Sequence, residues 1–172
     1  MELHIEQNIE TAMTKLLLSI LAVACSALLR LDAATNAAPP GSKFLACFVG
    51  RSPCYEIANE LGASVPEICY KLKWDITLFQ DEVTGAPTTY RIDATLYRQA
   101  PRLGRWKIVN GIQNHPNAIV YELEAASGHG AIRLFKADDN VMFFVGQNGR
   151  LMVGNADFSY TLNRAKEKFS GN

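Results

Sequence analysis

At 172 residues the chain has room for one domain and a leader segment. Its 17 basic residues balance 17 acidic ones, so the formal net charge is zero and there is no basic surplus to attract nucleic acid. The hydrophobic fraction of 48% is that of an ordinary globular domain.

The N-terminal part of the chain has the pattern of a secretory signal. Residues 1–12 are polar, and Lys15 then precedes the apolar run LLLSILAVACSALL. The run is short for a membrane-spanning helix. We therefore expect residues 1–34 to be a leader, with Met1 or Met13 as the true start, and the domain to be exported.

Cys25 stands at the end of this apolar run. The preceding Ala22-Val23-Ala24 and Cys25 resemble the lipobox of bacterial lipoproteins, in which the Cys becomes lipidated, although Leu21 sits one position early. The resemblance makes Cys25 a candidate lipid anchor. The alternative is a soluble secreted protein. Residues 35–42 have the small, Pro/Gly-containing composition of a flexible tether.

The first elements of the domain are a strand and a helix. The apolar run 43–49 predicts a strand, and residues 50–54 (GRSPC) are expected to break it. We expect a two-turn helix over residues 55–61. Ser52 is a candidate cap for this helix, and Pro53 suits a first helical position. Gly62 is the expected end of that helix.

From residue 70 the pattern changes to period two, which is typical of half-buried strands. Apolar and aromatic residues alternate with polar ones, and turn signals separate the runs. The alternating residues are Trp74, Ile76, Leu78; Tyr90, Ile92, Ala94, Leu96; Trp106, Ile108; Ile119, Tyr121, Leu123; and Ile132, Leu134. Turns are expected at residues 84–87, 101–104, 114–117 and 127–130.

The closing stretch, residues 138–164, predicts further strands. Val141 to Val145 is the first, and Asn148-Gly149 suits a hairpin turn. Leu151 and Val153 are expected to resume the strand, and residues 154–157 to turn the chain again. About eight strands without a crossover helix predict an all-β fold: a small antiparallel up-and-down β-barrel with one short N-terminal helix. The domain is expected over residues 43–165, followed by a polar tail at 166–172.

Three cysteines, Cys47, Cys54 and Cys69, fall inside this domain. Export favours a disulfide, and Cys54–Cys69 is the preferred pair, with Cys47 buried in the first strand. The alternative is a thiolate site for copper or zinc that uses Cys47 and Cys54. The usual C-x-x-C spacing is missing, which disfavours that alternative.

Other candidate groups have ordinary structural explanations. His115 and His129 lie in predicted turns, and methionines in apolar strands usually fill a core. Four aromatic residues are candidates to line a ligand cavity, or equally to pack a core: Tyr90, Trp106, Tyr121 and Tyr160. The chain contains no nucleophile elbow and no phosphate loop, so we expect no enzyme.

Several segments together resemble the N-terminal domain of NlpE-type lipoproteins. They are GRSPC before a short helix, KLKWDITLFQD, TYRIDATLYR and LMVGNADFSYTLNR, within residues 44–164. The resemblance implies a lipocalin-like barrel. It also implies a cell-envelope lipoprotein, in the outer membrane or periplasm, tied to copper resistance or surface-stress sensing. A partner would then be an envelope signalling protein.

This chain departs from the family's Pro-Cys-x-x-Cys motif. Pro53-Cys54 matches the first half, whereas Ile57 stands where the second Cys is expected. The family's metal role is therefore not carried over intact. A lipocalin-like carrier of a small apolar ligand in the cell envelope is the alternative function.

Overall fold

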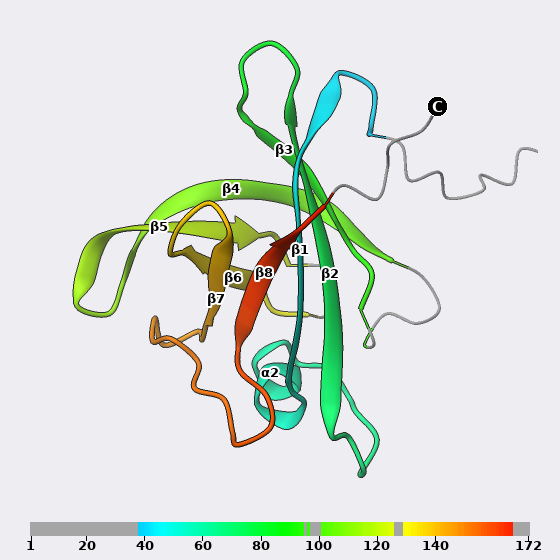
Figure 1. Ribbon diagram of the computed structural model, residues 1–172, viewed down its shortest axis with the longest axis vertical. Helices are drawn as coiled ribbons and strands as arrows, with labels where there is room; N and C mark the ends of the chain where they lie inside the picture. The colour runs from blue at the N-terminus through cyan, green and yellow to red at the C-terminus, as the bar shows by residue number, and fades with distance from the viewer. Residues whose placement is uncertain (1–37, 95, 97–100, 126–128, 167–172) are drawn as a thin grey trace, which may run out of the picture. The chain divides into compact units, whose positions relative to one another are not determined.

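A computed structural model describes residues 38–94, 96, 101–125 and 129–166 (Figure 1). The expected leader with Cys25, residues 35–37 of the tether and residues 167–172 of the tail lie outside these residues. Eight antiparallel strands and one short helix form in the described part. They are β1 (Ser42–Pro53), α2 (Tyr55–Glu60), β2 (Lys71–Asp81), β3 (Pro87–Ile92), β4 (Arg102–Ile112), β5 (His115–Leu123), β6 (Ile132–Lys136), β7 (Val141–Val145) and β8 (Thr161–Ala165).

The strands pair in chain order and close into a barrel. β1 pairs with β2 along its whole length and with β8 from Cys47, opposite Ala165, to Gly50, opposite Leu162. In Figure 1 the red β8 accordingly lies beside β1. The predicted all-β, up-and-down barrel with one short helix is confirmed. Closure removes the exposed edges that an open meander would have.

The barrel interior is filled by large apolar side chains that alternate along the strands. Those that are almost completely buried include Leu72, Ile76, Leu78, Ile92, Leu123, Ile132, Leu134, Met142 and Phe144. The helix α2 adds Ile57 and Leu61 to this core, as its spacing predicted. Side chains from all eight strands form one continuous cluster, and the burial of this cluster is the main source of the fold's stability.

Two loops fix α2 at the end of the barrel where β1 ends (Figure 1). The Gly130 amide donates to the Leu61 carbonyl at 3.0 Å, and the Gln147 amide donates to a Glu60 carboxylate oxygen at 2.8 Å. The helix is therefore held by its packing and by both loops. Within the described residues, no helix is long and apolar enough to cross a membrane.

The break expected at residues 50–54 is wrong, because β1 continues through Gly50 to Pro53. Gly50 allows a close approach: a Cβ there would lie 2.5 Å from the Thr161 carbonyl oxygen of β8. Ser52 does not cap the helix either. Cys54 occupies the N-cap position without a side-chain cap, and the Ser52 hydroxyl accepts a hydrogen bond from Trp74 instead.

The turn expected at residues 101–104 is also wrong, since β4 begins at Arg102. Gly104 packs beneath the Tyr90 ring, where a Cβ would lie 2.8 Å from ring atoms. β3 ends at Ile92, although the alternating pattern continued beyond it. A glycine that a neighbour's ring covers has the same sequence signature as a turn glycine.

The strand expected at Leu151 and Val153 does not form. The Asn148-Gly149 turn is present, with Gly149 at φ 77°, but only a single bridge, Val145 to Leu151, follows it. β8 pairs with β7 from Val141 to Phe143, and the 151–158 segment contacts β7 only at its start, through this bridge and the hydrogen bond from the Met152 amide to the Phe144 carbonyl. Val153 is consequently 82% exposed.

We expect Gly50→Ala to destabilise the barrel by about 1–3 kcal/mol, because the new methyl group meets a backbone oxygen that cannot rotate away. Urea unfolding followed by tryptophan fluorescence measures this loss. Arg51→Ala, at the exposed neighbouring position, is the control and is expected to change stability by less than about 0.5 kcal/mol. Equal stability of the two variants would contradict the close β1–β8 contact.

Candidate functional site at the disulfide end of the barrel

The predicted disulfide is present: Cys54, at the end of β1, is bonded to Cys69, just before β2, with 5.7 Å between their Cα atoms. It ties the loop of residues 61–70 to the start of α2. Cys54 is 2% exposed and belongs to the core cluster. The bridge therefore joins the barrel interior to a surface loop.

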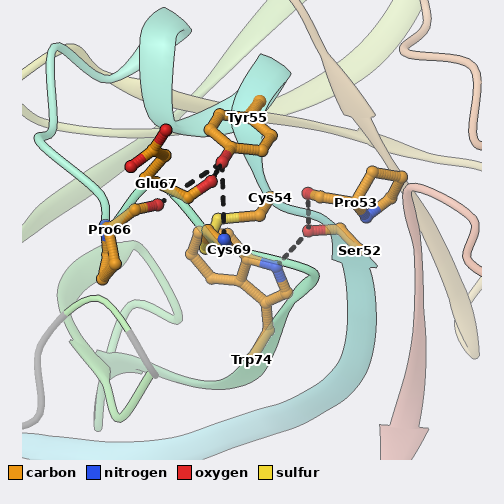
Figure 2. Close-up of a disulfide and its surroundings, with 8 residues drawn as sticks. All are labelled: Ser52, Pro53, Cys54, Tyr55, Pro66, Glu67, Cys69 and Trp74. Atoms are coloured by element: carbon orange, nitrogen blue, oxygen red, sulfur yellow. Dashed lines mark hydrogen bonds between the residues drawn. A yellow bond between two sulfur atoms is a disulfide. The ribbon is translucent and has the colours of Figure 1, made fainter.

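A tyrosine makes a second tie across the same loop (Figure 2). The Tyr55 hydroxyl donates to the Glu67 carbonyl and accepts from the Cys69 amide. The backbone of the loop thus contacts α2 at Glu67 and Cys69, next to the disulfide. These contacts hold the 61–70 loop in place, and its residue Ile68 is nevertheless exposed.

Beneath the bridge lies a buried polar contact. The Trp74 indole nitrogen donates to the Ser52 hydroxyl at 2.8 Å, and that hydroxyl lies 3.0 Å from the Pro53 carbonyl (Figure 2). Trp74 also packs on Phe144, with ring centroids 5.0 Å apart. The indole N–H is therefore satisfied while its rings join the core, as burial of a tryptophan requires.

A surface hollow of about 330 Å³ lies against the disulfide. It is lined by residues 53–56, 69–70 and 153–155, and we call it the disulfide-end groove. Its volume is at the lower end of that of ligand sites. Tyr55, Tyr70 and Val153 are exposed large apolar side chains on its wall.

The loop before β8 forms one side of this groove. Asn155 accepts from the amides of Asp157 and Phe158, which closes the turn predicted at 154–157. The Tyr70 hydroxyl donates to Asp157 at 2.6 Å, and this bond to the carboxylate raises the pKa of Tyr70. Tyr70 also meets Phe158 edge-on, with centroids 5.2 Å apart. The contacts hold the two walls together.

The candidate metal ligands do not converge. Cys47 is buried, and its thiol lies 3.1 Å from an Asp75 carboxylate oxygen. It stands seven residues of extended strand from Cys54, roughly 23 Å. Ile57, at the family's second Cys position, is buried in the core. In the described residues, no three His, Cys, Asp or Glu side chains gather in a group suited to a metal ion.

The aromatic residues proposed for a cavity belong to the packed core. Tyr90 and Tyr160 are 1% exposed and Trp106 is 4% exposed, and all three are members of the core cluster. Tyr121 is half-buried and packs on Trp106, with ring centroids 4.7 Å apart. Of the two interpretations left open by the sequence, the contacts of these side chains favour core packing.

One buried cation was not predicted from the sequence. Arg102, only 5% exposed, donates from Nε to the Tyr90 hydroxyl at 2.9 Å and from Nη2 to the carbonyls of Glu124 and Gly130. These contacts join β3, β4 and the loop between β5 and β6. No local pattern signals them, because every acceptor is distant in the chain and two are backbone oxygens.

Tyr160 brings a hydroxyl into the core close to the start of α2. The oxygen is buried and makes no well-formed hydrogen bond with the described residues, although Glu56 and the Ile57 backbone are its polar neighbours. Burial, with the Glu56 charge as a second cause, raises the pKa of Tyr160 far above its ordinary value. The folded barrel therefore favours the neutral phenol to a higher pH than the unfolded chain does.

A comparison of the chain with protein-family models, with curated proteins and with solved structures found no match. The functional assignment therefore depends on the residues themselves and on the resemblance described above.

We expect the double variant Cys54→Ser, Cys69→Ser to lose about 3 kcal/mol of stability, because the bridge closes a loop of 15 residues in the unfolded chain. Urea unfolding measures the loss, and adding a reductant to the wild type should reproduce most of it. Cys47→Ser, which keeps a hydrogen-bond donor opposite Asp75, is the control. A double variant as stable as this control would contradict a structural bridge.

Tyr160 predicts an alkaline limit to stability. Its pKa is raised by folding, so its contribution is complete below the unfolded value of about 10 and declines as the pH rises above that value. The stability of the wild type should therefore fall relative to Tyr160→Phe between about pH 10 and 11.5. Urea midpoints measured over this range check the difference. A constant difference would contradict a buried, neutral phenol.

Proposed function

We propose that the chain is a non-enzymatic, exported lipoprotein of the cell envelope, of NlpE-like type, in which the barrel senses surface stress. The observation that carries the proposal is the junction at the end of β1. There, Pro53-Cys54 leads from a barrel strand directly into a short helix. This is the arrangement that the resemblance implies at the start of a lipocalin-like barrel. The disulfide agrees with an oxidising compartment.

Copper handling fits these residues poorly. The Cys54 thiolate is consumed in the disulfide, Ile57 provides no ligand, and Cys47 is roughly 23 Å along the strand. This chain therefore has no pair of thiolates for copper(I) at the position of the family's Pro-Cys-x-x-Cys motif. Our proposal keeps surface-stress sensing and an envelope signalling protein as the partner, and leaves copper out.

The alternative, a carrier of a small apolar ligand, has less support. Of its four candidate lining residues, three belong to the core cluster and Tyr121 packs against it, on Trp106. A carrier needs space that those side chains now fill. We therefore rank the sensing function first.

The lipoprotein part of the proposal is tested by labelling. When the full chain is produced in a Gram-negative cell fed an alkyne-tagged fatty acid, we expect the label on the wild type, which should fractionate with membranes. Cys25→Ser is expected to lose the label and to stay soluble or unprocessed. Cys47→Ser should behave as the wild type.

An unlabelled wild type that fractionates as a soluble periplasmic protein would contradict the lipid anchor. It would leave an exported, soluble barrel, which is the alternative that the sequence left open.

A further inference from the structure

The disulfide-end groove exposes apolar side chains that folding normally covers. Ile68 is 92% exposed, Val153 is 82% exposed and Tyr70 is 61% exposed. Tyr70 and Val153 both line the hollow, and Ile68 directly precedes the bridged Cys69. Clustered exposed apolar residues on a soluble domain commonly mark an interaction site.

The exposed side chains belong to segments that other contacts hold in place. The disulfide and the Tyr55 hydroxyl hold one wall, and the Asn155 side chain closes the turn of the other. Gly154 packs so tightly on the Phe158 carbonyl that a Cβ would not fit. A partner therefore meets a preformed surface, and binding costs little ordering of the groove.

One acidic residue lines the hollow, and two others lie in the loops that contribute its walls. Glu56 is part of its lining, Glu67 lies in the tied loop, and Asp157 is fixed by Tyr70. Lys71 is nearby, with its ammonium group 5.8 Å from the Phe158 ring centroid. Carboxylates around an apolar hollow favour a partner with positive charge next to a large apolar side chain.

The described ends of the barrel domain lie away from the groove. β1 begins at Ser42, opposite Asp81, whereas the groove lies at the other end, where Pro53 pairs with Lys71. β8 ends at Ala165, beside Cys47 and beyond the middle of β1 as seen from the groove. The first and the last described strand thus begin and end away from the groove, which favours a separate molecule as its occupant.

We propose that the disulfide-end groove binds a peptide segment of a partner protein in which Lys or Arg stands next to a large apolar residue. The apolar side chain enters the hollow that Tyr70 and Val153 help to line, and the cation meets Glu56 or Glu67. This inference goes beyond the proposed function, because it concerns the barrel alone and is independent of a lipid anchor.

The test is a selection of random octapeptides, displayed on phage, against the disulfide-intact protein as purified from cells. We expect enrichment of sequences that pair Lys or Arg with Phe, Trp, Leu or Ile. Synthetic copies should bind Val153→Asp at least about tenfold more weakly. Glu56→Gln should reduce the preference for Lys and Arg.

Val83→Asp is the matched control. Val83 is 93% exposed in the β2–β3 turn, near the start of β1 and so at the opposite end of the barrel. This variant is expected to bind the peptides as the wild type does. Equal thermal unfolding of the two Val→Asp variants shows that both remain folded.

Three outcomes would overturn the proposal. The first is no enrichment, or enrichment of acidic or uncharged sequences. The second is equal weakening by Val83→Asp and Val153→Asp. The third is sedimentation with phosphatidylcholine vesicles that Val153→Asp abolishes, without peptide enrichment, which would assign the groove to a lipid surface.

Discussion

The structure depends first on the double pairing of β1. This strand runs from Ser42 to Pro53, pairs with β2 over its length and also accepts β8, so it carries the seam that closes the barrel. The seam requires a residue without a side chain at position 50, where the β8 backbone approaches most closely. The register of β1 against β2 then places Ser52 beside Trp74 and brings Cys54 to Cys69.

The register of β1 against β2 also determines which contacts form at the disulfide end of the barrel. The bridge, the Tyr55 hydroxyl and the Trp74–Ser52 hydrogen bond connect α2, β1 and β2. Trp74 packs on Phe144, and Phe144 meets Tyr160, with ring centroids 6.2 Å apart. Crosslink, helix and aromatic core therefore form one continuous packed unit. An exposed groove on such a unit is a rigid binding surface, since neither wall is an isolated loop.

Much of the fold could be predicted from the sequence, because it is encoded locally. Period-two alternation identified most strands, and the spacing of Ile57 and Leu61 identified the helix. The Cys54–Cys69 pair followed from the export signal and from the number of cysteines. These inferences need only neighbouring residues and knowledge of the compartment.

The misassigned elements depend on partners that are distant in the chain. Gly50 and Gly104 have the signature of breaks, but they are needed because Leu162 and Tyr90 lie against them. Leu151 and Val153 alternate like a strand, yet β8 occupies the position beside β7. The groove itself was not predicted, because its walls come from three separate segments, and no single segment shows that their apolar side chains stay exposed.

Cys54, which directly follows β1, forms a structural crosslink to Cys69 rather than a thiolate metal site. The direct test is peptide mapping by mass spectrometry, on protein purified from the producing cells, alkylated and digested without reduction. We expect one linked peptide pair that joins Cys54 to Cys69, with Cys47 alkylated. Alkylation of all three cysteines, or a bond between Cys47 and Cys54, would contradict it.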